Sequence, residues 1–167
     1  VHLLNLAASR ALKPLPRLST QPKHISSKLK CVRIVLGGTN SERHVSLMSG
    51  RNVYFKLRAQ PSLELSVWAI DSHHQVTPLK DYHLLHHNLD DLWHHLSEEA
   101  KPTYPTHLLS SIYLQLTSQE PSTPLAYTPM ALNDFLAQSK THNAFIFNCL
   151  HGGFGEDGTF QHLCETH

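Results

Sequence analysis

The chain has 167 residues, of which 40% are hydrophobic and 16% charged, which is enough for one domain of ordinary size with a buried core. No run of 18 apolar residues is present, so the sequence predicts no transmembrane helix, and a net charge of +1 gives no reason to expect nucleic acid as a partner. The three cysteines, Cys31, Cys149 and Cys164, show no CxxC spacing, which argues against a disulfide framework or cysteine-based zinc site and favours a reducing compartment.

The first thirty residues differ in charge from the rest. Residues 1–33 carry seven basic side chains and no acidic one, whereas the remainder holds the other seven basic groups and all 13 acidic ones. We therefore predict a basic, acid-poor leader or linker at 1–30 and a domain at 31–167. An organellar transit peptide, a flexible linker and the remnant of an upstream domain all fit this composition. Because the chain starts at Val1 and stops at His167 within a motif, we expect a fragment.

The domain opens with a strand and a helix joined by a glycine turn. Residues 32–36, Val-Arg-Ile-Val-Leu, are a β-branched run that ends at Gly37 and Gly38, which predicts a buried strand followed by a turn. Ser41 is expected to be the N-cap of the helix that follows, and apolar residues at helical spacing carry that helix to about Arg58.

Two more strands are predicted, at 63–70 and 144–150, with a helix at 130–140 before the second. Strands alternating with helices predict an α/β fold with a Rossmann-like parallel sheet. In such sheets ligands bind beyond the carboxyl ends of the strands, and both glycine-rich loops of the chain follow strands. The stretch at about 72–129 is interpreted as a long His/Pro-rich insertion on the surface.

The insertion contains a helix and many histidines. Its apolar stripe is formed by Leu85, Leu89, Leu92 and Leu96, whereas residues 108–116 fit either a strand or a short helix. His83 and His87, four residues apart, have a spacing that can place two imidazoles on one zinc ion. The leucine stripe takes the opposite face, however, so we interpret the histidines as a solvent-exposed polar face. No HExxH motif is present, and no metal site is expected in this fragment.

The most informative segment follows the third predicted strand. It reads His-Gly-Gly-Phe-Gly-Glu-Asp-Gly-Thr-Phe-Gln at 151–161. Glycines allow backbone N–H groups to approach a ligand closely, and such amides at a helix N-terminus suit a carboxylate or phosphate. His151 is placed to add a hydrogen bond or a positive charge. Glu156 and Asp157 are expected to hold the loop by accepting amide hydrogen bonds.

This segment resembles the first signature of the D-alanine–D-alanine ligases, His-Gly-x-x-Gly-Glu-Asp-Gly-Thr-x-Gln. The earlier segment 36–50, Leu-Gly-Gly-Thr-Asn-Ser-Glu-Arg-His-Val-Ser-Leu-Met-Ser-Gly, is similar to the first glycine loop of the same enzymes. The resemblance implies the Rossmann-like, pre-ATP-grasp N-terminal domain of a ligase, incomplete at its C-terminus. The two-lobed ATP-grasp domains would be absent from this fragment.

The resemblance also implies a chemistry. In that family ATP phosphorylates the carboxylate of one D-alanine, and the amine of a second D-alanine attacks the acyl phosphate. Glu42 matches the catalytic residue that holds the ammonium of the first D-alanine. The residues matched to substrate binding are His151, Gly152, Val45 and Ser46. Loop structure is assigned to Gly37, Gly38, Gly155, Glu156, Asp157 and Gly158.

Several further expectations follow from the resemblance. ATP and Mg²⁺ would be bound mainly by the missing C-terminal part, so the fragment alone is expected to be inactive. The full-length protein would be an ATP-dependent ligase for peptidoglycan precursors, with D-alanine and ATP as partners, a homodimer through this domain, and no nucleic-acid or membrane partner. The second substrate, D-alanine, D-lactate or D-serine, stays open.

Two alternatives to the ligase function remain from the sequence. One is a truncated, non-catalytic module that binds an amino acid or a partner. The other, a dinucleotide-binding domain, is disfavoured because no GxGxxG follows the first strand. The expected compartment is the cytoplasm, or the plastid stroma or mitochondrial matrix if residues 1–30 are a transit peptide.

Overall fold

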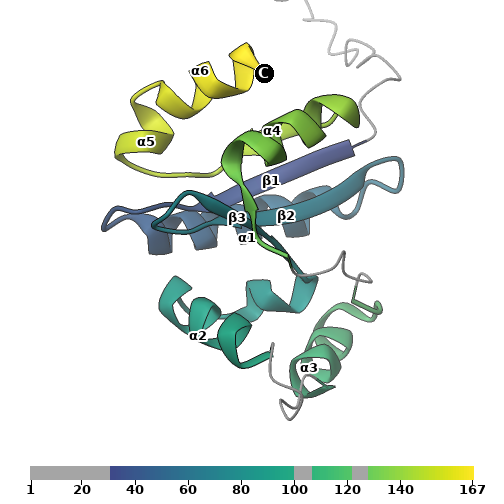
Figure 1. Ribbon diagram of the computed structural model, residues 1–167. Helices are drawn as coiled ribbons and strands as arrows, with labels where there is room; N and C mark the ends of the chain where they lie inside the picture. The colour runs from purple at the N-terminus through teal and green to yellow at the C-terminus, as the bar shows by residue number, and fades with distance from the viewer. Residues whose placement is uncertain (1–30, 100–106, 122–127) are drawn as a thin grey trace, which may run out of the picture.

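The structure is a computed structural model that describes residues 31–99, 107–121 and 128–167. The leader or linker predicted at 1–30 lies outside these residues, as do parts of the predicted insertion. The described part folds as a sheet with helices on both faces, as Figure 1 shows. The predicted α/β class is confirmed.

Five strands form one sheet in the order β4-β3-β2-β1-β5. They are β1 (Cys31–Gly37), β2 (Glu64–Ile70), β3 (Gln75–Leu79), β4 (Met130–Ala131) and β5 (Phe145–Asn148). Strand β1 lies between β2 and β5 and runs parallel to both. In contrast, β3 runs antiparallel to β2 and to β4. The predicted strands β1, β2 and β5 are parallel as expected, whereas β3 and β4, which the sequence did not predict, make the sheet mixed.

The reversal of direction comes from a tight turn between β2 and β3. One oxygen of Asp71, Oδ1, accepts the backbone N–H groups of His73 (2.8 Å) and Gln75 (2.9 Å), and His74 adopts φ 57. Such a short connection can join only antiparallel neighbours. Residues 75–79 fall within the insertion that the sequence predicts at about 72–129. They belong to the sheet, where Pro78 pairs with Trp68.

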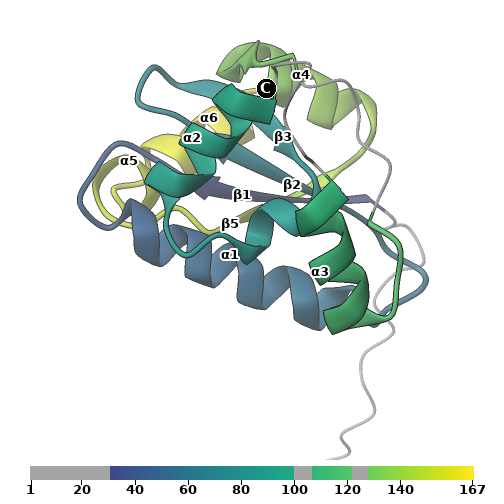
Figure 2. The same cartoon turned by 90° about the horizontal axis from the view of Figure 1, so that it is seen from below.

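Helices cover both faces of the sheet (Figures 1 and 2). One face carries α1 (Arg43–Leu57), α2 (Leu89–Glu99) and α3 (His107–Thr117). A short 3-10 helix, η1 (Asp81–Leu85), comes directly before α2. The other face carries α4 (Leu132–Thr141), α5 (Gly153–Glu156) and α6 (Thr159–Thr166). Residues 108–116 thus form a helix rather than a strand.

The helix boundaries correct two details of the sequence prediction. Ser41 is not the N-cap of α1, because that helix starts at Arg43 with Glu42 as its N-cap. The turn before the helix is held instead by Asn40, whose Oδ1 accepts the N–H of Glu42 at 2.9 Å. Leu85 is not part of α2 either, since it ends η1. The C-terminal end of α1, at Leu57, agrees with the prediction.

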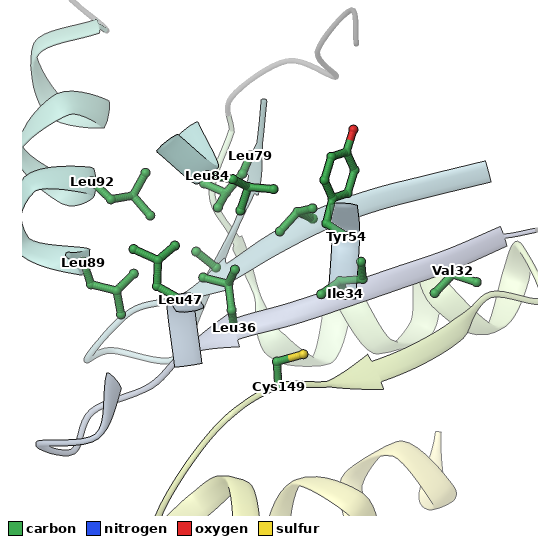
Figure 3. Packing of buried hydrophobic residues seen from close by; sticks show 12 residues of the cluster. Val32, Ile34, Leu36, Leu47, Tyr54, Leu79, Leu84, Leu89, Leu92 and Cys149 are labelled. Carbon is green, nitrogen blue, oxygen red and sulfur yellow. The ribbon is translucent and has the colours of Figure 1, made fainter. Parts of the chain in front are cut away.

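The core lies in two layers because successive residues of β1 point to opposite faces. Val32, Ile34 and Leu36 contact Leu47 and Tyr54 of α1, together with leucines of α2, as Figure 3 shows. On the other face Val35 packs with aromatic and aliphatic side chains of β2, α4 and α6. These are Trp68, Ile70, Phe135, Leu136 and Phe160.

Two neighbouring residues of α1 test this packing. Leu47 is fully buried, whereas the side chain of Met48 is 55% exposed. We expect Leu47→Ala to lower the free energy of unfolding by roughly 2–5 kcal/mol, because it removes a core side chain and leaves a cavity. Met48→Ala, the control, should change it by less than about 0.5 kcal/mol. Urea unfolding followed by circular dichroism measures both, and equal losses would contradict the packing.

Candidate functional site

The two glycine loops meet at one edge of the sheet. Parallel neighbours present their carboxyl ends at the same edge, and the first loop follows β1 while the second follows β5. The loops also touch directly, since the side-chain amide of Asn40 donates a hydrogen bond to the carbonyl of His151. Residues 111 positions apart in the chain are thereby brought into one site, as the motif order suggested.

Glu42 lies at the junction between the loops. Its side chain is exposed, and its Oε2 atom would be only 3.0 Å from a Cβ atom placed on Gly152. Gly152 has φ +64, and a Cβ atom there would also collide with the side-chain amide of Asn40. In the described residues, the Glu42 carboxylate makes no hydrogen bond or ion pair. It therefore presents an unengaged negative charge beside the second loop.

His151 is held from both sides. Its Nε2 atom is 2.8 Å from the hydroxyl of Ser49 on α1, and its Nδ1 atom is 3.2 Å from Oε1 of Glu156. The imidazole keeps 32% of its surface exposed. Two hydrogen bonds on opposite ring nitrogens fix the ring plane while one edge stays open to solvent. A pocket beside it is lined in part by Ser49, His151, Glu156 and Gln161.

From the sequence, Ser49 was expected to have no role beyond packing or the surface. It lies inside the first glycine-loop motif, but its partner is 102 residues away, so spacing carried no signal for the pair. The sequence interpretation of Glu156 is also corrected: its Oε1 atom faces the imidazole of His151 rather than a backbone amide. Asp157 does accept a backbone amide hydrogen bond, as expected: its Oδ1 accepts the N–H of Thr159 at 2.8 Å. This backbone hydrogen bond lowers the pKa of Asp157.

Of the two residues proposed at the start of α1, Val45 faces solvent and Ser46 does not. Val45 is 48% exposed, whereas Ser46 is fully buried. The Ser46 hydroxyl accepts the N–H of Gly37 at 2.8 Å, so it supports the first glycine loop. Gly37 itself has φ +105, and a Cβ atom there would lie 2.4 Å from the carbonyl oxygen of Ile70. A role of Ser46 in substrate binding stays a prediction.

The second loop is fixed through Gly155. Its carbonyl oxygen accepts the side-chain amides of Asn148 (2.9 Å) and Gln161 (3.1 Å), two supports that the sequence analysis did not name. Cys149, in the same wall of the pocket, is buried, and burial raises its pKa to about 11. Its thiol therefore stays protonated at neutral pH and is no nucleophile.

The histidines of the predicted insertion do not form a uniformly solvent-exposed face. His87 and His94 are exposed, as predicted, but His83 and His95 are buried. The reason lies in the helical period: His95 is three residues after Leu92, so it shares the buried side of α2 with the leucine stripe.

No helix in the described part is long and apolar enough to cross a bilayer.

Two glycines of the second loop differ in the space around them. A Cβ atom on Gly155 would lie 2.4–2.8 Å from atoms of Leu150, including its backbone, whereas one on Gly153 would meet nothing within 4 Å. Gly155→Ala should therefore lower the free energy of unfolding by roughly 1–3 kcal/mol. Gly153→Ala should stay within about 0.5 kcal/mol of the parent chain. Thermal unfolding of both variants checks this, and an equal effect would speak against the close approach.

Comparison with known proteins assigns the family. The model of the family described as D-ala D-ala ligase N-terminus matches residues 31–167. Searches of curated proteins and of solved structures found no match. The matched span contains both glycine loops and every described strand and helix. On this evidence the chain belongs to the D-Ala–D-Ala ligase family, of which it carries the N-terminal domain.

Proposed function

We propose that this chain is the substrate-binding N-terminal part of an ADP-forming D-alanine–D-alanine ligase that serves peptidoglycan precursor synthesis. Family membership supports a ligase. The observation that carries the substrate assignment is the unengaged carboxylate of Glu42 beside Gly152, next to the half-buried imidazole of His151. An α-amino acid carries a positive ammonium and a negative carboxylate only a few atoms apart, and this site offers opposite partners for both.

Glu42 is proposed to bind the ammonium group of the first D-alanine. An ammonium removed from water is stable only with an opposite charge beside it. The Gly152 backbone adjoins this carboxylate closely enough that a larger residue would crowd it. A small amino acid can then lie between the loops with its ammonium on Glu42.

His151 is proposed to bind the carboxylate of the same D-alanine. Glu156 on Nδ1 holds the ring and favours an N–H at that position, and Ser49 on Nε2 fixes its rotation. In the protonated form both nitrogens donate, and the imidazolium adds positive charge near the substrate carboxylate. Ser49 and Glu156 act through His151 and are positioning residues. Val45, at the exposed start of α1, is proposed to form part of the apolar wall.

ATP with Mg²⁺, when bound, supplies the phosphoryl group that activates the carboxylate of the first D-alanine. We propose that both are held mainly by ATP-grasp domains outside the matched N-terminal domain, so residues 31–167 alone are inactive. The part played by this chain is to bind and orient the first substrate. The proposed compartment is the cytoplasm, or an organelle if residues 1–30 prove to be a transit peptide, and the proposed assembly is a homodimer.

The intact mass of the native gene product separates this proposal from a non-catalytic binding module. A mass above 18.9 kDa by roughly one or two further domains, together with D-alanine-dependent ADP release, is expected for a ligase. A product of 18.9 kDa or less that binds D-alanine would instead support the module. The isolated chain is the right sample for measuring that binding.

Glu42→Gln tests the ammonium site in the complete gene product. We expect kcat/KM for D-alanine to fall by about 100-fold or more, because the amide keeps the shape and loses the charge that faces the ammonium. ADP release at saturating ATP measures it. Glu165→Gln removes an exposed carboxylate of α6 and should leave kcat/KM unchanged. Turnover of the Glu42 variant equal to that of the parent enzyme would reject the assignment of Glu42.

Ser49→Ala tests the positioning of His151. Loss of one hydrogen bond corresponds to about 0.5–1.5 kcal/mol, so we expect KM for D-alanine to rise by up to roughly tenfold while kcat changes less. Ser111→Ala, at an exposed site on α3, is the matched control. Ser49→Thr keeps a hydroxyl and should recover part of the affinity. A pure loss of folded enzyme, with KM unchanged, would mean that Ser49 only supports packing.

A further inference from the structure

A second cluster of ionisable side chains joins η1 to α2, away from the glycine loops. One nitrogen each of His83 and His95 and one carboxylate oxygen of Glu99 lie within 4.8 Å of one another. His83 Nε2 is 2.9 Å and His95 Nε2 is 3.8 Å from Oε2 of Glu99. These side chains are 0%, 3% and 6% exposed. Two imidazoles and a carboxylate shielded from water are a donor set typical of zinc and related ions.

A further imidazole adjoins this cluster. The ring of His86 lies 4.8 Å from that of His95, centroid to centroid. Its Nε2 atom is buried and has no hydrogen-bond partner among the residues that the structure describes. Buried polar atoms nearly always have a partner, and an exception calls for an explanation such as an ion. We propose that His83, His95 and Glu99, with His86 as a fourth donor, form a closed binding site for a divalent transition-metal ion such as Zn²⁺.

The surroundings orient the carboxylate toward the histidines. Lys80 Nζ, at 2.7 Å, and the hydroxyl of Tyr82 both donate to Oε1 of Glu99. The other oxygen, Oε2, therefore faces His83 and His95. Donors of this kind hold a ligating carboxylate in place in known metal sites. The Lys80 ammonium also balances the charge of Glu99, and the metal would bring its own positive charge to two neutral imidazoles.

The protonation state of the histidines suits a metal. Burial is the main cause that lowers the pKa values of His83, His86 and His95 below the usual 6.5, so the rings are neutral at pH 7, as ligands must be. His83 Nδ1 accepts the backbone N–H of Lys80 at 3.0 Å, which leaves the ring proton on Nε2. Metal at Nε2 displaces that proton to Nδ1, and the Lys80 amide gives up this single hydrogen bond.

A metal here would tie the C-terminal half of α2 to η1, with no open position for a substrate. Adjacent ligands around a tetrahedral zinc ion are about 3.3–3.5 Å apart. For His83, His95 and Glu99, whose donor atoms lie within 4.8 Å of one another, changes of about an ångström in these separations give that geometry. The site would be structural, and it would stabilise the fold in proportion to how tightly the metal binds.

Titration of the full 167-residue chain with Zn²⁺ and Co²⁺ tests the proposal, after the chain is stripped with a chelator. Competition with a chromophoric chelator is expected to show one tight equivalent, and Co²⁺ should give the intense visible absorption of a tetrahedral site. The apparent Kd should rise at least tenfold in His95→Ala and Glu99→Gln. His94→Ala removes the exposed imidazole next to His95 on the same helix and should keep the tight equivalent.

Either of two outcomes would contradict the proposed metal site. If His94→Ala and His95→Ala weaken binding alike, or if no equivalent binds more tightly than exposed histidines do, the cluster is a metal-free hydrogen-bond network and the proposal is wrong. Far-ultraviolet circular dichroism of the metal-free variants separates loss of a ligand from loss of fold. Should His95→Ala fail to fold, Glu99→Gln decides, because its amide oxygen still accepts from Lys80 and Tyr82.

Discussion

The parallel pairing of β1 with β5 is the contact on which the candidate site depends. Val32 to Val35 lie opposite Phe145 to Asn148, and the N–H of Cys149 continues the ladder by donating to the carbonyl of Val35 at 2.8 Å. In this register β5 ends opposite Val35, close to the end of β1 at Gly37, so the two strands finish at the same edge of the sheet. The loops that follow can then exchange contacts, and the hydrogen bond from Asn40 to the carbonyl of His151 closes the junction. A strand order that separated β1 from β5 would leave Glu42 and His151 apart.

The first helix is fixed to this edge by small residues. Gly37 lies close to the backbone of Ile70, and its N–H donates a hydrogen bond to the hydroxyl of Ser46. Gly50 packs against Leu36. A methyl group on Gly50 would come within 2.7 Å of the Leu36 side chain, which explains a glycine in the middle of a helix despite its cost of about 1 kcal/mol. Close approach of α1 to β1 places Ser49 within hydrogen-bond distance of His151.

The segment between β3 and β4 adds a second polar centre to an otherwise apolar face. Leu89 and Leu92 join the core, and the N–H of Leu89 donates to the imidazole of His44 at 3.2 Å, which links the start of α2 to α1. Further along the same helix lies the carboxylate of Glu99. It is surrounded by the polar side chains of Lys80, Tyr82, His83 and His95. The hydrogen bonds to that carboxylate lower the pKa of Glu99 against the opposing effect of burial. The charged side chains of Lys80 and Glu99 are tolerated in this interior because they form an ion pair with each other.

The sequence by itself determined the α/β class, the positions of β1, β2 and β5, the course of α1 and the two glycine loops with their family resemblance. These features rest on local periodicity and on glycines that only particular turns require. Tertiary structure alone decided the direction of β3, the pairing of Ser49 with His151, and the burial of His83 and His95. Spacing along the chain shows which residues share a helix face. It does not show which face the rest of the molecule covers, because burial is a property of the packed layers and not of any single segment.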